Sequence, residues 1–405
     1  MKQKIRVLVA MSGGVDSSVA ALMMKKNGFD VLGVFMKNYS DTKNELGECS
    51  WKDERKMAMK ICSLLGIPLI TLDFEKQYKK QVIEKMFRDY KKGITPNPDI
   101  DCNRKIKFPL LIKAMKKLRA KYIVTGHYSR IKKTKNNLRL FRARDEMKDQ
   151  SYFLYRLNQN ELKHLKFPIG DFTKKQVREI ARKNNFPNFD KKSTVGICFV
   201  GKVNLKRFLQ KKIKPKKGKI ISPDGKVIGE HDGIYYYTIG QRLGSRYGIN
   251  ISKDTDDKRF LKRWYVARKD AKTNAIIAAP ENHPLLFRKE IFIKNTHWIN
   301  KDEIEKLISS GERTGSKSKI RKIFANEVSN NFGEGGRGIG GGINEKNFNV
   351  LARIRQVGEL LPCKIIFGKK IKVALKKPIT GVSEGQAIVI YKGKEVLGGG
   401  EICFN

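Results

Sequence analysis

The chain has 405 residues, of which 40% are hydrophobic, so it predicts two or three packed domains and excludes disorder throughout. Its 86 Lys and Arg against 40 Asp and Glu give a formal net charge of +46, which favours a polyanionic partner such as a nucleic acid, although a lysine-rich proteome would raise the charge without one. No run approaches the roughly 20 apolar residues of a membrane span, so we expect a cytoplasmic protein with no membrane contact.

Predicted strands and helices alternate over the first 125 residues. Strands are expected at 5–11, 31–36, 68–74 and 122–125, and helices at 16–26, 51–65 and 108–118. This alternation is typical of a parallel sheet covered by helices on both faces, so the predicted fold class is α/β, with an N-terminal domain over 1–205. Ligands of such sheets bind beyond the carboxyl ends of the strands.

Beyond residue 205 the pattern changes. A strongly basic stretch, 206–219, precedes short β-like segments with Gly turns, at 219–221, 233–239, 264–268 and 275–279. Further β-like segments lie at 350–357, 371–375 and 387–391. We predict a small middle module over 206–285 and a C-terminal β-barrel over 286–405. Residues 309–349 are rich in Gly, Ser and Lys, which predicts a mobile insertion in the barrel.

A candidate phosphate-binding loop joins the first strand to the first helix. It consists of Ala10, Met11, Ser12, Gly13, Gly14, Val15, Asp16 and Ser17. Two glycines let the backbone approach an anion, and the helix start supplies free N–H groups. Asp16 would repel phosphate unless a cation is shared, so Mg²⁺ is implied. The loop lacks the P-loop lysine, which disfavours kinase or GTPase chemistry, and the plain alternative is a strand-to-helix turn with an Asp–Ser cap.

Six cysteines are present without a Cys-x-x-Cys pair, and the chain has only five histidines, so a zinc site or a secreted disulfide framework is not expected. Cys102 lies in a Pro-rich stretch interpreted as a loop. Three cations follow it and would lower its pKa, whereas Asp101 would oppose them. From spacing alone, Cys198 in its apolar stretch is better interpreted as a buried structural thiol. The remaining thiols are core or packing candidates (Cys62, Cys363 and Cys403) or undecided (Cys49).

Several of these motifs match known families. The segment Ser-Gly-Gly-Val-Asp-Ser-Ser resembles the PP-loop of ATP-pyrophosphatases, which cleave ATP between the α and β phosphates and adenylate a substrate oxygen. Both cysteine segments resemble, in their residues and in their order along the chain, motifs of the tRNA-specific 2-thiouridylase family. So do the segments 125–128, 148–154, 237–242 and 353–356. The resemblance runs from the first strand almost to the C-terminus and misses chiefly 309–349.

The resemblance implies ATP- and Mg²⁺-dependent 2-thiolation of the wobble uridine of tRNA by a monomer. It makes Cys102 the nucleophile and Cys198 the carrier of a persulfide received from a sulfur-relay protein or cysteine desulfurase. Asp99 becomes a candidate acid–base, and Met36 and Gly126 would line the adenosine site. The implied tRNA contacts are Asn97, Pro98, Asp99, His127, Lys148, Asp149, Gln150, Arg355 and Gln356.

Two positions depart from the family pattern. Asp101 stands where the family usually has an apolar or neutral residue, and Ser193 stands where an acidic residue is common. Two rival interpretations also remain. A PP-loop enzyme acting on a small metabolite would leave the charge and both cysteine motifs unexplained, and a non-catalytic RNA-binding or sulfur-carrier protein would not need the intact loop. The preferred interpretation requires the fold to bring Cys102 and Cys198 together.

Overall fold

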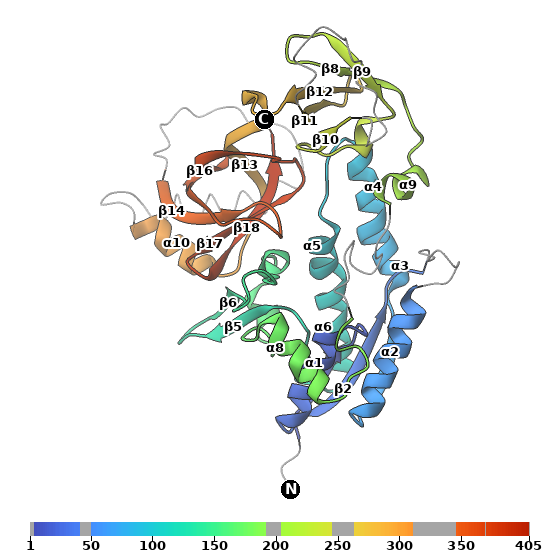
Figure 1. The fold of residues 1–405 in the computed structure, drawn as a ribbon. Helices are drawn as coiled ribbons and strands as arrows, with labels where there is room; N and C mark the ends of the chain where they lie inside the picture. The colour runs from blue at the N-terminus through green and yellow to red at the C-terminus, as the bar shows by residue number, and fades with distance from the viewer. Residues whose placement is uncertain are drawn as a thin grey trace.

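The computed structural model describes residues 4–40, 50–191, 204–244, 263–310, 346–368 and 370–404. Three sheets organise these residues, and Figure 1 shows them as a lower N-terminal domain, an upper middle domain and a C-terminal barrel beside the helices that connect the other two. Within the described ranges, none of the helices combines the length and apolar character that a membrane span requires.

The N-terminal sheet is parallel and has the order β3-β2-β1-β4-β7. Its strands are β1 (Arg6–Ala10), β2 (Asp30–Lys37), β3 (Leu69–Asp73), β4 (Tyr122–Val124) and β7 (Leu165–Lys166). Val7, Leu8 and Val9 of the central strand are fully buried, as expected where helices cover both faces of a parallel sheet. The predicted α/β fold class is confirmed.

Helices pack on this sheet and extend from it toward the middle domain (Figure 1). They are α1 (Val15–Lys26), α2 (Ser50–Leu64), α3 (Glu75–Tyr78), η1 (Lys79–Ile83), α4 (Glu84–Lys91), α5 (Pro98–Cys102), η2 (Asn103–Lys107), α6 (Phe108–Lys117), η3 (Ser151–Leu154), α7 (Gln159–Leu162) and α8 (Lys174–Lys183). Both η1 and η2 are π-helical turns that join their neighbouring α-helices without a break.

The interpretation of Cys102 as a loop residue was wrong. Cys102 ends α5, and the helix continues through η2 into α6. The Asn97 side chain accepts a hydrogen bond from the Ile100 backbone N–H, and Pro98 occupies the first helical position. An Asn cap followed by Pro is a helix-start signal, because the fixed φ of proline suits the first turn and its missing N–H is not needed there.

The middle domain is a five-stranded sheet with the order β10-β11-β12-β8-β9. Its elements are α9 (Leu205–Gln210), β8 (Gly218–Ile221), β9 (Val227–His231), η4 (Ile234–Tyr236), β10 (Arg242–Leu243), β11 (Trp264–Asp270) and β12 (Ala275–Pro280). The expected strand at 233–239 is wrong, because its centre is the 3₁₀ turn η4. There the buried rings of Tyr235 and Tyr236 direct their hydroxyls to the carbonyls of Lys214 and Ile213.

The C-terminal domain is a closed six-stranded barrel, as predicted. Its strands follow the order β13-β16-β15-β14-β17-β18, and a further pairing of β13 with β18 closes the ring. Its elements are η7 (Pro284–Leu286), β13 (Phe287–Trp298), α10 (Lys301–Ser310), β14 (Lys346–Arg353), β15 (Leu361–Phe367), β16 (Ile371–Thr380), β17 (Ala387–Lys392) and β18 (Glu395–Cys403). The predicted insertion falls mostly outside the described residues, and its described ends belong to α10 and β14.

A hairpin from the N-terminal domain joins the barrel sheet. Strands β5 (Ser129–Lys133) and β6 (Leu138–Arg142) pair with each other, and β6 also pairs with β18 through Leu140 opposite Val396. The barrel is therefore fixed to the first domain by shared sheet hydrogen bonds. The domain boundaries expected near residues 205 and 285 stay predictions.

Candidate nucleotide and thiol site

The candidate phosphate loop has the backbone that its sequence predicts. Gly13 has φ +71°, and a Cβ added there would lie 2.3 Å from the backbone oxygen of Glu54, so only glycine fits. Ser17 Oγ donates to the Gly14 carbonyl over 2.9 Å and accepts from the Ser12 N–H over 3.2 Å. These bonds fix the loop at the start of α1, where the first backbone N–H groups of a helix have no intrahelical acceptor and can bind an anion.

Asp16, in the first turn of α1, has two partners from distant parts of the chain. Lys174 Nζ lies 2.6 Å from Asp16 Oδ1, and the Tyr128 hydroxyl donates to the same oxygen over 2.8 Å. Burial and the Asp16 carboxylate raise the pKa of Tyr128 far above its ordinary value, so this phenol stays protonated. Asn188 also stabilises the loop, because its Nδ2 donates to the Gly13 carbonyl over 3.1 Å.

The carboxyl ends of three parallel strands meet beside this loop. β1 leads into it, β2 ends just after Met36, and β4 is followed by Gly126. A Cβ on Gly126 would lie 2.6 Å from the Asp16 carbonyl carbon, so glycine permits the close approach of these two segments. Met36 and Gly126, the predicted adenosine-site residues, therefore both lie at the carboxyl edge of the sheet. A nucleotide whose phosphates bind at the loop would extend along this edge.

His127 follows Gly126 and packs between two phenylalanine rings. Its ring centroid is 5.9 Å from that of Phe108 and 5.7 Å from that of Phe167. Burial, together with the nearby Lys107 ammonium 3.5 Å away, holds the pKa of His127 well below its ordinary value. The imidazole is therefore neutral at physiological pH. Lys107 belongs to η2, so this contact ties the helix that carries Cys102 to the nucleotide edge.

Cys102 itself has no exposed surface and belongs to a core cluster with Ile106 and Tyr78. It directly precedes the π-turn η2, and such turns often occur at functional sites. The neighbouring Asp101 does not stand alone: its carboxylate lies 3.1 Å from Lys85 Nζ and 3.2 Å from Lys105 Nζ. The charge expected to oppose thiolate formation at Cys102 is therefore compensated by two lysines.

Other described thiols are poor candidates for sulfur chemistry. Burial raises the pKa of Cys62 to about 11 and that of Cys363 to about 12. Cys403 is also shifted upward by burial. Because the thiolate is the reactive form of cysteine, these three side chains act as packing groups.

The loop before α5 is held by the barrel. Gln386, which precedes β17, donates to the Pro96 carbonyl over 2.9 Å, and Asn97 Nδ2 donates to Gln386 Oε1 over 3.2 Å. The predicted base-contact residues Asn97, Pro98 and Asp99 are half-buried and lie at this junction of the first domain with the barrel. The structure thus brings these residues together with the helix of Cys102.

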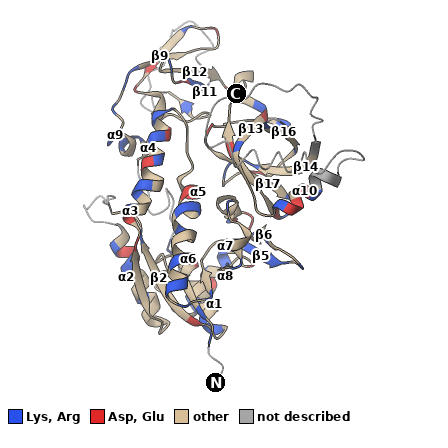
Figure 2. Ribbon diagram, turned by 180° about the vertical axis from the view of Figure 1, so that it is seen from behind, with Lys and Arg blue, Asp and Glu red and all other residues tan. Residues whose placement is uncertain are grey.

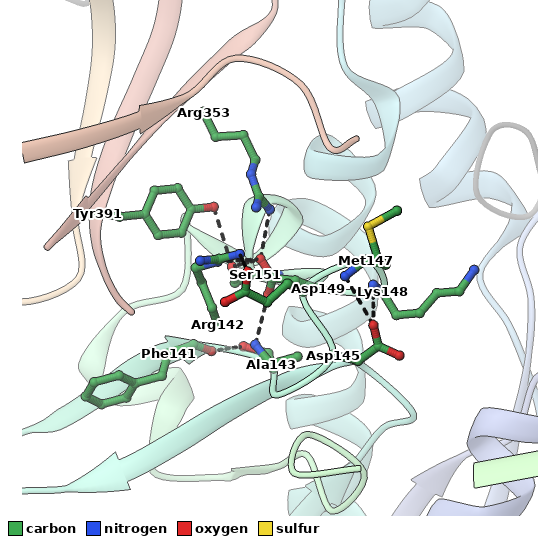
Figure 3. Close-up of polar contacts among 12 residues, drawn as sticks. Phe141, Arg142, Ala143, Asp145, Met147, Lys148, Asp149, Ser151, Arg353 and Tyr391 are labelled. Atoms are coloured by element: carbon green, nitrogen blue, oxygen red, sulfur yellow. Dashed lines mark hydrogen bonds and ion pairs between the residues drawn. The ribbon is translucent and has the colours of Figure 1, made fainter. Parts of the chain in front are cut away.

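Figure 3 shows a buried cluster around Asp149 where the first domain meets the barrel. The Asp149 carboxylate is fully buried, lies 2.8 Å from Arg353 Nη1, and accepts from the Ala143 and Ser151 backbone N–H groups. Gln356 donates to the Asp149 carbonyl. The side chain of Asp149 thus stabilises the domain junction, and its contact with tRNA stays a prediction.

Neighbours of Asp149 remain accessible. Lys148 and Arg355 are exposed, and Arg355 donates to the Thr380 carbonyl over 2.9 Å. Gln150 is half-buried and accepts from the Tyr128 N–H over 2.9 Å. Lys148, Arg355 and Gln356 therefore lie around one buried cluster, although they come from segments far apart in the sequence. Their contacts with tRNA stay predictions.

Cys198 and Ser193 lie outside the described residues, as does Cys49. Both flanks of the segment that carries Cys198 are described. Burial raises the pKa of Glu54, and the positive charge of nearby Lys191 opposes this rise. The backbone of Glu54 lies directly beside Gly13. On the other flank, the Phe208 ring lies 6.3 Å from that of Tyr39, two residues beyond β2. Both flanks therefore lie near the carboxyl edge of the N-terminal sheet.

Sequence reasoning missed Lys174, Asn188 and Gln386 as site residues. Asn188 had no signal of its own, because a single Asn after a helix is common in loops. Lys174 is one of 86 Lys and Arg residues, so its position next to Asp16 is visible only in the fold. Tyr128 belongs to the 125–128 motif, but no pattern in the sequence indicates its hydrogen bond to Asp16.

Comparisons with known proteins agree with this geometry. Residues 5–202 match the family described as tRNA methyl transferase HUP domain, 206–280 the tRNA methyl transferase PRC-barrel domain, and 338–402 the aminomethyltransferase beta-barrel domain. The first match covers the sheet and its lysine-free phosphate loop. Together they define an ATP-using enzyme of the PP-loop class.

The particular family follows from relatives over the full chain: this protein belongs to the tRNA-specific 2-thiouridylase family. It is 38% identical to tRNA-specific 2-thiouridylase MnmA of Bacillus pumilus, over 98% of this chain and 94% of the relative. The MnmA of Bacillus subtilis is 37% identical over the same shares, and MnmA 1 of Geobacillus kaustophilus is 44% identical over 75% of this chain and 79% of the relative. A 4-thiouridine synthetase–RNA complex with bound ATP resembles the fold at 15% identity and TM-score 0.32, over 51% of this chain and 50% of the solved chain, which is too remote to support an argument.

Proposed function

We propose that the chain replaces the C2 oxygen of the tRNA wobble uridine with sulfur, at the expense of ATP. The observation that carries this proposal is the juxtaposition of a phosphate loop with the helix of Cys102, linked through Lys107, His127 and Gly126. Relatives that match nearly the whole chain are named for this activity. The reaction class is adenylation followed by sulfur transfer.

ATP would bind at residues 10–17, with adenosine along Met36 and Gly126. Among the described residues, no group of three or more His, Cys, Asp and Glu could hold a metal ion. Mg²⁺ would therefore be held chiefly by the phosphates of ATP, with Asp16 as a protein carboxylate that is 30% exposed at the loop. Mg²⁺ would neutralise phosphate charge, and the loop N–H groups would orient the α-phosphate.

Sulfur transfer would use both predicted thiols. The uridine C2 oxygen attacks the α-phosphate and releases pyrophosphate, which converts that oxygen into part of an AMP leaving group. The terminal sulfur of a Cys198 persulfide then bonds to C2, and the C–O bond to AMP breaks. Attack of Cys102 on the inner sulfur of Cys198 breaks the S–S bond, leaving a Cys102–Cys198 disulfide that an external dithiol reduces with two electrons.

The burial of Cys102 has a consequence for this mechanism. A thiol with no exposed surface cannot be reached from solvent by the wobble base unless its surroundings move. Its helix is held from both ends, by the Gln386 clamp on the loop at 95–97 and by the Lys107–His127 contact. We expect the wobble base to enter between these two contacts after leaving its stack, and to open the pocket around Cys102.

The tRNA would lie along the basic face of the elongated part of the molecule. Lys and Arg are spread over α4, η2, α6 and α9 (Figure 2). The lysines at 211–219 are exposed, and a cavity of about 540 Å³ beside Tyr39 is lined by Lys79, Lys211 and Lys212. Exposed cations next to an aromatic ring suit phosphates and splayed bases.

This surface predicts a steep salt dependence. If six or more phosphates are contacted, the affinity for tRNA should fall by roughly 10³ between about 50 and 200 mM salt, because bound counterions are released. A filter-binding or fluorescence titration across that range measures the slope. A flat response would remove tRNA from the proposal.

The function is tested by mass spectrometry of tRNA nucleosides after incubation with ATP, a persulfide donor and this protein. We expect 2-thiouridine at the wobble position and pyrophosphate release that depends on tRNA. Pyrophosphate release with an aspartate-type nucleophile instead would favour the rival small-metabolite enzyme. Two matched domains carry descriptions that mention methyl transfer, and the same spectrum distinguishes a methyl addition from sulfur replacement.

The setting follows from the same chemistry. We propose that the enzyme acts in the cytoplasm, and the buried free thiols Cys62 and Cys363 support this because such thiols suit a reducing compartment. We propose that a persulfide sulfur-relay protein or a cysteine desulfurase supplies the sulfur, and that the chain acts as a monomer.

A further inference from the structure

Lys174 is a buried lysine that reaches the phosphate loop. It is 8% exposed, and its Nζ lies 2.6 Å from Asp16 Oδ1. Its backbone is fixed as well, because its N–H donates to Asp145 over 2.8 Å and Thr173 caps the helix that it begins. Burying an ammonium costs free energy unless it is paired, so the burial of Lys174 at the loop depends on a negatively charged partner.

The same lysine lines a cavity of about 420 Å³. The other residues around this cavity are Lys175, Arg178, Glu179, Arg182, Phe189 and Asp190. Cations outnumber carboxylates here, and Arg182 is engaged by Glu179 at 3.1 Å. The cavity is therefore suited to an anion, and Lys174 stands between it and the loop.

We propose that Lys174 binds the phosphates of ATP and supplies the positive charge that the loop sequence lacks. This inference rests on the ATP use in the proposed function and names a residue for it. In this structure Lys174 neutralises Asp16. With a cation and nucleotide bound, Asp16 would hold the cation, Lys174 would be available to a phosphate oxygen, and the cavity lined by Arg178 would receive the pyrophosphate end of ATP.

A purely structural role is the alternative, in which Lys174 only neutralises Asp16. The two roles differ in nucleotide affinity. A charge-assisted hydrogen bond to phosphate is lost in Lys174→Met, so we expect the Kd for ATP and for inorganic pyrophosphate to rise about 10- to 100-fold. Isothermal titration calorimetry of the full chain without tRNA measures both constants. Lys183→Met, on the exposed side of the same helix, is the matched control and should bind like the parent protein.

A second variant keeps the test decisive if Lys174→Met unfolds. The double variant Asp16→Asn/Lys174→Met removes both charges, and it is compared with Asp16→Asn alone. We expect the double variant to bind inorganic pyrophosphate at least about tenfold more weakly than Asp16→Asn. Equal affinities in this pair, or an unchanged Kd in a folded Lys174→Met protein, would overturn the inference.

These titrations are independent of thiolation. If the parent protein binds ATP through Lys174 but forms no 2-thiouridine, the proposed function fails and the role of Lys174 stands. If thiolation occurs and Lys174→Met binds ATP normally, only the role of Lys174 fails.

Discussion

Replacing Cys198 with serine is expected to eliminate 2-thiouridine formation while tRNA-dependent release of pyrophosphate from ATP continues. A hydroxyl cannot form a persulfide, so no sulfur is presented to the activated base. The phosphate loop is unchanged in this variant, and adenylation of the uridine oxygen does not require the second thiol. Mercury-affinity gels measure the thiolated tRNA, and a coupled assay measures pyrophosphate.

Two further variants sharpen this expectation. Cys102→Ser should also block multiple turnover, because the thiol that releases the sulfur from Cys198 is missing. Cys403→Ser is the control, since that half-buried thiol lies at the end of β18 and its pKa is raised by burial. Full thiolation by Cys198→Ser would refute the persulfide assignment, and loss of thiolation in Cys403→Ser would show that serine substitution alone damages the fold.

The fold was largely predictable because hydrophobic periodicity is a local property. Strands β1, β2 and β4 and helices α1 and α6 lie within a few residues of the expected ranges. The β5–β6 hairpin was not predicted to extend the barrel sheet, because its partner strand β18 lies more than two hundred residues away. No local pattern encodes such a pairing.

The site was predictable where one segment carries the chemistry. The loop at 10–17 is one continuous strand-to-helix turn, so its sequence was sufficient to predict its backbone. The environment of Cys102 was not, because the segment around Pro98 can be read as a loop or as a helix start and only packing decides between them. The effect of Asp101 also required the fold, since Lys85 comes from another helix. Burial works to lower the pKa of Lys85, yet Asp101 and Asp89 hold that pKa above its ordinary value.

The roles that the family resemblance implies for individual residues stay predictions, and the fold adds their burial and contacts. Asp149 and Gln356 are both predicted to contact tRNA, and in this structure Gln356 also donates a hydrogen bond to the Asp149 carbonyl across the domain junction. A motif can persist in a family because it holds two domains together. Burial separates these cases, since a fully buried carboxylate cannot meet a ligand in solvent without unfolding its surroundings.

Asp149→Ala is expected to destabilise the junction between the first domain and the barrel by about 3–5 kcal/mol, because it leaves buried charge without a partner. The side chain of Arg353 is only 4% exposed, so its guanidinium would stay buried without its partner. Arg142 Nε also lies 3.5 Å from the Asp149 carboxylate. The backbone donors of Ala143 and Ser151 would lose their acceptor as well. Hydrogen exchange of β14 and β6 measures the local effect, which a single melting temperature of a multidomain protein would blur.

The matched control is Asp30→Ala, which removes an exposed ion pair with Arg6 and should cost less than about 1 kcal/mol. The double variant Asp149→Leu/Arg353→Met replaces the buried pair by apolar groups and should recover much of the stability, because neither charge is then stranded. Arg142 keeps its second partner, Glu146, at 3.5 Å in that protein. Equal protection of the junction in Asp149→Ala and Asp30→Ala would show that the cluster does not hold the barrel in place. Other junction contacts, such as the β6–β18 pairing and the hydrogen bond from the Tyr152 hydroxyl to the Ala387 carbonyl, would then have that role.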